Sequence, residues 1–171
     1  WSSDVCSSDL TDLPGGWFVQ HRNVSASNTL YLNQTSAQTP VGNGWGGTPM
    51  TSTTFYVGGT DTNEPGATYV AYIWAHDTDI NGVVQCGSFT TDGSGNATVN
   101  LGWEPQFLEM KRSDGTSSWI ILDTMRGWVS ADISNAYPLY ANLPNAESAV
   151  VTMCKPTATG FQATSFVASA T

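Results

Sequence analysis

Basic residues are scarce in this sequence. Five Lys and Arg residues stand against 14 Asp and Glu residues, which gives a formal net charge of −9 at pH 7. That balance repels a phosphate backbone and offers no basic cluster to an anionic bilayer. Apolar runs are also short, and none approaches the roughly 20 residues that a membrane-spanning helix needs. We therefore expect no nucleic-acid partner and no membrane insertion.

Cysteine and histidine are also few. Cys86 and Cys154 lie far apart in apolar stretches, and the sequence contains no Cys-x-x-Cys pair and no Cys/His cluster with metal-binding spacing. We expect buried free thiols, with a Cys86–Cys154 disulfide as the alternative. His21 and His76 are the two histidines, and no Gly-x-Ser-x-Gly elbow supplies a nucleophile for them to activate. The sequence predicts a protein that is not an enzyme and has no catalytic residues.

The first ten residues are unlike the rest of the chain. Trp-Ser-Ser-Asp-Val-Cys-Ser-Ser-Asp-Leu lacks the basic start, apolar core and cleavage site of a signal peptide. It resembles the translation of a common sequencing-library adapter, a string found at the ends of genes from fragmentary environmental assemblies. We expect residues 1–10 to be an artefactual leader, with a Ser-rich mobile leader as the alternative. The natural residues before about Thr11 are then unknown.

Strand-forming residues dominate the remaining sequence, and Gly, Asn, Asp and Pro interrupt them at short intervals. The predicted strands are residues 16–21, 29–33, 53–57, 68–75, 82–90, 97–101, 106–111, 118–123, 138–141, 149–153 and 161–167. Asp114-Gly115 gives the clearest hairpin turn. A short helical turn is expected only at 142–148, after Pro144. We predict an all-β fold with little helix, an antiparallel β-sandwich or jelly roll with a Trp- and Tyr-rich interior.

Three sequence blocks recur in the same order. Gly-Gly-Trp17-Phe-Val-Gln-His matches Ser-Ser-Trp119-Ile-Ile-Leu-Asp, so both tryptophans should hold equivalent places in the core. Residues 29–38 match 138–147, and residues 49–55 match 155–161. Duplication explains such an ordered set better than chance. We predict one β-sandwich unit over 11–123 and the start of a second, truncated repeat over 124–171, packed on the first or on a neighbouring subunit.

The first copy of the repeat lacks a counterpart to the strand at 102–111. A sandwich without a central strand would leave an open, aggregation-prone edge. We therefore expect the backbone of residues 107–111 to pair with strands before residue 91.

Four motifs form an ordered string along the chain. They are Tyr69-Val-Ala-Tyr-Ile-Trp-Ala75, Cys86-Gly-Ser-Phe-Thr90, residues 99–112 ending in Lys111-Arg112, and Trp119-Ile-Ile-Leu-Asp-Thr-Met-Arg-Gly127. This string resembles the uncharacterised tandem domain common in structural proteins of tailed bacteriophages. The sequence departs from that pattern at Glu109, inside a strand that is normally apolar, and at His21-Arg22-Asn23.

The resemblance implies a non-enzymatic virion component made in the cytoplasm of a bacterial host. A tail-fibre or appendage protein involved in host attachment is the favoured interpretation. A decoration protein that cements a capsid or tail and a carbohydrate-binding β-sandwich module are the alternatives. The partners would be other virion subunits, including further copies of the chain, with a trimer favoured because fibres are usually trimers.

One loop has the opening pattern of a calcium site. Asp77, Asp79 and Asn81 alternate and Gly82 is sixth, but Ser88 stands where the loop would need a bidentate Glu. Asp and Asn also favour tight turns, so a turn is the main interpretation and Ca²⁺ the alternative; no other cofactor is expected. As a glycosidase pair, Asp77 and Asp79 stand too close in sequence to oppose one another.

Three tryptophans lie near turns, where their rings could stack on sugars. They are Trp45, in a Gly-rich loop, Trp103 and Trp128. Aromatic rings offer broad, flat contact surfaces, and a cell-surface glycan is the ligand that such positions suggest. Core packing is the main interpretation for all three, and sugar stacking is the alternative.

Overall fold

The computed structural model describes the backbone of residues 2–10 and, with their side chains, residues 15–42, 44–77, 79, 82–130, 136–147 and 154–164. The secondary structure of these residues is antiparallel β-strands with two short helical turns. The predicted all-β fold is confirmed. Within the described ranges no helix is long and apolar enough to cross a membrane.

The elements follow one another in a simple order. The strands are β1 (Ser2–Leu10), β2 (Phe18–His21), β3 (Asn28–Tyr31), β4 (Thr39–Pro40), β5 (Tyr69–His76), β6 (Ala97–Asn100), β7 (Phe107–Met110), β8 (Ile120–Asp123), β9 (Cys154–Thr157) and β10 (Gly160–Ala163). The helical turns are α1 (Thr60–Asn63) and the 3₁₀ turn η1 (Thr124–Arg126).

The chain folds into two compact units. Unit 1 comprises Trp1–Ser88 and Arg112–Thr116, and unit 2 comprises Phe89–Lys111 and Ser117–Thr171. The division after Ser88 differs from the boundary expected after residue 123. The reason is that β7 and β8 share a core with β9 and β10, which places all four strands in unit 2.

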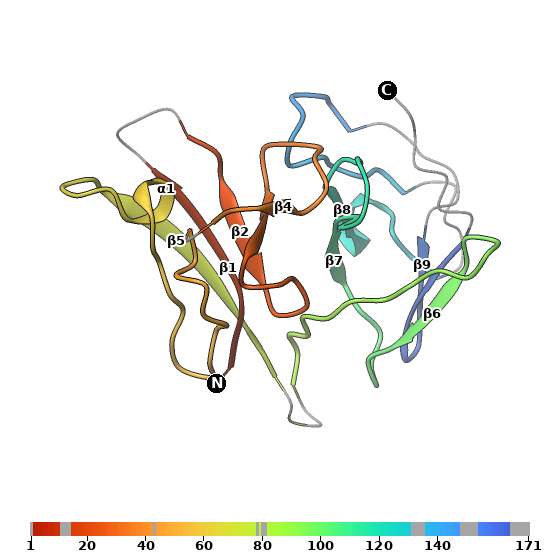
Figure 1. The fold of residues 1–171 in the computed structure, drawn as a ribbon. Coiled ribbons are helices and arrows are strands. Elements are labelled where there is room, and N and C mark those ends of the chain that lie inside the picture. Colours follow the sequence, from red (N-terminus) through yellow and green to blue (C-terminus); the bar gives the residue numbers. More distant parts are fainter. Residues whose placement is uncertain are drawn as a thin grey trace. The chain divides into compact units, whose positions relative to one another are not determined.

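Unit 1 is built on a five-stranded sheet in the order β4-β3-β2-β1-β5 (Figure 1). The backbone of β1 pairs with β2 on one side and runs antiparallel to β5 on the other. Phe18, Val19 and Leu30 are buried, and the ring of Phe18 meets those of Tyr31 and Trp45 edge-on, at centroid distances of 4.9 and 6.4 Å. The apolar core of unit 1 therefore lies over β2 and β3.

Unit 2 contains the sheet β6-β10-β9 and the strand pair β7-β8. Both contribute to one apolar cluster: Met110, Ile120, Leu122, Trp128, Ala136, Cys154 and Phe161. Ile120 and Leu122 alternate with less buried neighbours along β8, as expected for a strand with one face on a core. Two sheets facing one core form a small sandwich.

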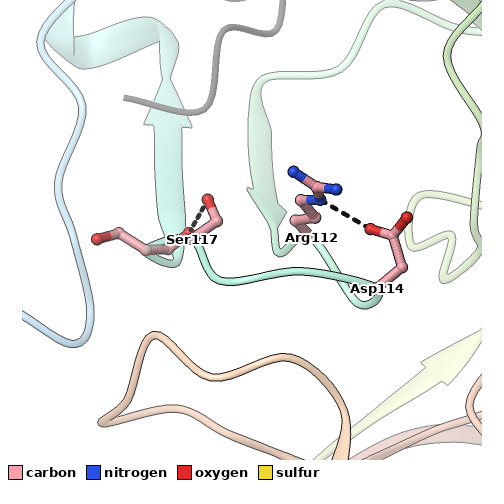
Figure 2. Close-up of polar contacts among 4 residues, drawn as sticks. Arg112, Asp114 and Ser117 are labelled. Atoms are coloured by element: carbon pink, nitrogen blue, oxygen red, sulfur yellow. Dashed lines mark hydrogen bonds and ion pairs between the residues drawn. The ribbon is translucent and has the colours of Figure 1, made fainter. Parts of the chain in front are cut away.

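The hairpin predicted at Asp114-Gly115 is confirmed. Met110 pairs with Ile120 and Phe107 with Asp123, and residues 111–119 connect the two strands. Figure 2 shows the Arg112 Nε at the start of this connection directed at Asp114 Oδ1, 2.8 Å away. Both side chains are largely exposed, so this ion pair adds at most about 1 kcal/mol to stability.

The two units hold the same strand pair in the same register. Residues 5–8 of β1 pair with β2, and the residues 102 positions later, Phe107–Met110, pair with β8 in the same way. The next pairing also corresponds, because Val19 of β2 pairs with Leu30 of β3, and Ile121 of β8 forms an isolated bridge with Leu139. These pairings match the repeat blocks that contain Trp17 and Trp119.

A side-chain hydrogen bond recurs at the same place. The N–H of Trp17 donates to Asn33 Oδ1 (3.0 Å), and the N–H of Trp119 donates to Asn142 Oδ1 (2.8 Å). The last residue of β2 and the last residue of β8 also play the same part, because the side chain of each accepts a hydrogen bond from a backbone N–H shortly after the strand. His21 Nδ1 accepts from the N–H of Asn23, and Asp123 Oδ1 accepts from that of Arg126.

Five expectations about the secondary structure need correction. The backbone of Phe107–Met110 pairs with β8 and not with a strand before residue 91, because residues 5–8 of β1 take the corresponding place in unit 1. Residues 53–57 and 82–90 contain no strand, and residues 138–141 form only the isolated bridge at Leu139. Residues 142–147 are not helical. The strand predicted at 149–153 lies outside the described residues.

Residues 2–10, which belong to the expected leader, form β1 between β2 and β5 of the unit 1 sheet. Their origin in an adapter remains a prediction. No disulfide joins Cys86 and Cys154. Both were expected to be buried thiols, which is confirmed for Cys154, whereas Cys86 has intermediate exposure. Cys154 is buried in the unit 2 core, where burial raises the pKa of its thiol to about 12.

Candidate functional site

Strand β5 is the most exposed apolar element of unit 1. It forms one edge of the five-stranded sheet, and its exposed residues are Val70, Tyr72, Ile73 and Trp74, with relative exposures of 40 to 51%. Successive side chains of a strand point to opposite faces, so apolar groups are accessible on both faces of β5. A long apolar edge strand of this kind favours contact with another molecule.

Three aromatic rings form a row on one face of this sheet. The rings of Trp17 and Tyr72 are stacked, with centroids 5.9 Å apart and planes 15° apart. Trp74 continues the row at 6.3 Å from Tyr72. Tyr72 and Trp74 lie two residues apart on β5, and Trp17 stands just before β2, across β1 from them. We call Trp17, Tyr72 and Trp74 the aromatic row.

Hydrogen bonds fix both ends of β5. The Tyr69 hydroxyl accepts from the N–H of Glu64 at 2.8 Å, which ties the first residue of β5 to the end of α1. At the other end, His76 Nδ1 accepts from the N–H of Cys86 at 3.1 Å. The strand that carries two of the three rings is therefore held in a defined position within unit 1.

For Trp45 and Trp128 the main interpretation, core packing, is confirmed, and the sugar-binding alternative is wrong. Both side chains are fully buried, with relative exposures of 0%, so neither ring offers a face to a sugar. Trp128 lies in the unit 2 core and donates from Nε1 to the carbonyl oxygen of Cys154 at 3.0 Å.

A set of loop hydrogen bonds encloses Trp45. The N–H of Gly58 donates to the carbonyl of Gly44 at 2.9 Å, and the Thr62 hydroxyl lies within hydrogen-bonding distance of the carbonyl oxygens of Gly44 and Gly58. The Gly-rich sequence therefore folds inwards over Phe18 and does not project its tryptophan.

Trp103 and Trp17 have intermediate exposure. Trp103 lies on the segment between β6 and β7, and its indole Nε1 is buried with no partner among the described residues. Trp119 is buried, as expected for a core residue. Trp17 was expected to be equally buried but has intermediate exposure, with its ring stacked on that of Tyr72.

The loop with calcium-like spacing forms a tight turn at its described residues. Asp77 Oδ1 accepts from the N–H of Asp79 at 2.9 Å, and the carbonyl of Asp79 accepts from the N–H of Gly82 at 2.9 Å. Asn81 lies outside the described residues. No three His, Cys, Asp or Glu side chains come together to hold a metal in the part of the chain that is described. The Ca²⁺ site at Asp77, Asp79 and Asn81 stays a prediction.

Comparisons with known proteins identify a family. A family profile described as "Domain of unknown function (DUF7483)" matches residues 9–169. The chain belongs to this family. Comparison with curated proteins gave no match, and neither did comparison with solved structures.

The aromatic row was missed at the sequence level. Tyr72 and Trp74 were assigned to a predicted strand, but nothing in the pattern showed that this strand would lie at a sheet edge with both faces exposed. The available signal was the spacing of Tyr72 and Trp74. They stand at alternate positions of a motif that begins with Tyr69, so their rings share one face of the strand. Solvent exposure of that face depends on the sheet order, which local patterns do not encode.

Proposed function

We propose that this chain is a non-enzymatic structural protein of a tailed-bacteriophage virion, part of a tail fibre or appendage involved in host attachment. The observation that carries the proposal is the pair of β-strand units with matching register, β1–β2 and β7–β8. Tandem units of one design are typical of proteins that build extended structures from repeated modules. The four-motif string supports the particular assignment to a phage.

Surface chemistry supports a role in assembly or attachment. The chain has a net charge of −9, while unit 1 presents the apolar strand β5 and its aromatic row. An apolar patch in otherwise polar surroundings marks an interaction site more often than a random exposure. Other copies of the chain, in a trimer, and other virion subunits are the partners we propose.

Mass spectrometry of purified particles tests this proposal. Trypsin should release Ser113–Arg126, because Arg112 and Arg126 bound this segment. We expect this peptide at constant stoichiometry in gradient-purified particles of a phage that encodes the sequence. Its absence from particles, with presence in the soluble lysate, would contradict a virion role. Gold-labelled antibodies against the chain should then mark fibres, whereas labelling over the capsid or tail surface would support the decoration protein instead.

A carbohydrate-binding module is the second candidate, and the aromatic row favours it. Stacked, half-exposed rings offer flat apolar faces of the kind that sugar rings can cover. If glycans bind there, Tyr72→Ala and Trp74→Ala should each weaken binding at least tenfold on a glycan array and in calorimetry. Tyr137→Ala, which removes an exposed ring outside the row, is the matched control. Equal loss with the control variant, or no loss, would exclude the row as a glycan site.

A further inference from the structure

We infer, independently of any role in a virion, that the outer edge of β7 is a strand-addition site that accepts an extended peptide segment of the Tyr69–His76 type. Strand β7 pairs with β8, and no other described strand pairs with it. In unit 1 the corresponding residues of β1 pair on one side with β2 and on the other with β5. Among the described residues, unit 2 thus has the same strand pair with no strand at the position that β5 takes in unit 1.

The hydrogen bonds show which backbone groups of β7 face that open edge. The N–H of Thr124 donates to the carbonyl of Gln106, so this pair is bonded across the β7–β8 ladder. Ile121 instead exchanges both of its backbone hydrogen bonds with Leu139. The pair Glu109–Ile121 is therefore a non-bonded pair of the β7–β8 ladder. Bonded and non-bonded pairs alternate in an antiparallel ladder. The N–H and carbonyl groups of Phe107 and Glu109 therefore point away from β8, into the open edge.

Unit 1 shows the register that an added strand would take. Val5 pairs with Trp74, Cys6 with Ile73, Ser7 with Tyr72 and Ser8 with Ala71. Replacing each β1 residue by the β7 residue 102 positions later places Trp74 of the added strand opposite Phe107, and Tyr72 opposite Glu109. The incoming strand would then hydrogen-bond through Tyr72 and Trp74.

The side chains around the edge define the chemistry of the partner. Leu108 and Met110 face the unit 2 core, and Phe107 stands 57% exposed on the opposite face. A fitting strand has small or aliphatic residues on the core face, as Ala71 and Ile73 provide, and aromatic residues on the other face beside Phe107. Peptide recognition by strand addition draws affinity from the backbone and specificity from such alternate side chains.

The direct test uses a synthetic peptide of residues Thr68–His76, with a short Lys tail for solubility and a fluorescent label, and the full chain. Anisotropy measures binding, and residue-resolved NMR hydrogen exchange locates it. We expect the amides of Phe107 and Glu109 to exchange at least tenfold more slowly with saturating peptide. Leu108 and Met110, whose amides already face β8, should change much less.

Two proline peptides provide matched controls. Tyr72→Pro removes an N–H that should donate to the carbonyl of Glu109, and we expect at least tenfold weaker binding. Ala71→Pro removes an N–H that points away from β7, where an edge strand tolerates proline, and should bind more tightly than the Tyr72→Pro peptide. Protection at β5 in place of β7, equal binding by the two proline peptides, or no binding at millimolar peptide would each overturn the inference.

Discussion

Gln20 and Leu122 stand at corresponding positions of β2 and β8, but only the apolar side chain of Leu122 suits a buried position. Both side chains are buried, at 2% and 3% relative exposure. The Oε1 of Gln20 has no hydrogen-bond partner among the described residues, and a buried amide oxygen without a partner loses its hydration with no compensation. Residue-level differences between the two units therefore identify local weak points.

Replacing Gln20 with Leu should stabilise the protein. Gln20→Leu keeps a similar volume and removes the unsatisfied amide, and we expect the free energy of unfolding to rise by about 1 kcal/mol. Urea unfolding followed by tryptophan fluorescence measures the change. Gln106→Leu, at an exposed site before β7, is the control and should leave stability within about 0.5 kcal/mol. A destabilised Gln20→Leu variant would show that the amide is satisfied in solution.

Glu109 gives a pH-dependent prediction. Burial raises the pKa of its carboxyl above the ordinary value of 4.5. The native state therefore holds this proton more tightly than the unfolded state. The resulting stability is present below the ordinary pKa and is lost as pH rises through the raised pKa.

Glu109→Gln removes this titration. We expect the variant to be more stable than the wild type at pH 7 and the difference to shrink as the pH falls towards about 4. Urea unfolding of both proteins across that range gives the measurement. Glu104→Gln, at an exposed position in the same unit, should show a smaller pH-dependent difference. A Glu109→Gln effect of constant size at every pH would rule out burial of a charged carboxylate as its cause.

At the scale of elements, local pattern predicted the strands better than it predicted their neighbours. Strands β2, β3, β5, β6, β7 and β8 fall within or next to predicted ranges, because alternating β-branched and aromatic residues mark them. Sheet order was harder to predict: β7 was expected to pair with the first half of the chain and pairs with β8. The hairpin turn at Asp114-Gly115 by itself predicts the pairing of β7 with β8. The expectation followed instead from the first copy of the repeat, which lacked a strand that β7 was expected to replace.

The two asparagine hydrogen bonds should contribute unequally. Asn142 holds the N–H of Trp119 in a part-buried setting, whereas the corresponding bond from Trp17 to Asn33 is exposed. We expect Asn142→Ala to lower the free energy of unfolding by about 1 kcal/mol, and Asn33→Ala to cost less. Urea unfolding of the two variants side by side measures both. A larger cost at Asn33 would mean that the two bonds do not play corresponding roles.

The correspondence of β1 with β7 can also be tested by transplanting residues. Cys6 and Ser8 hold the register positions of Leu108 and Met110, which face the unit 2 core. If the register positions correspond, the double variant Cys6→Leu, Ser8→Met should stabilise unit 1 by about 1–3 kcal/mol, as expected for apolar residues at core positions. Hydrogen exchange of the β2 and β5 amides reports on that unit. A Ser7→Leu control, at the register position of Glu109, should give less, and an equal gain would contradict the register.

At the scale of the whole molecule, an acidic and largely polar chain presents an apolar edge strand on unit 1. On unit 2 it presents an edge of β7 that no strand in the described part of the chain pairs with. An isolated protein would be expected to protect such edges with charge or bulges. Their exposure fits a subunit that is completed by neighbours in an assembly. Strand addition at β7 and contact over β5 are the two ways in which the structure could provide this.

A subunit-resolved electron cryomicroscopy reconstruction of a particle that contains this chain tests the central claim most directly. We predict both units in ordered repeating positions along a tail fibre or appendage, with an extended strand from a neighbouring segment paired along β7 opposite Phe107 and Glu109. A reconstruction of the complete particle without density for this fold, or one in which the chain is present and β7 faces only solvent, would contradict the account.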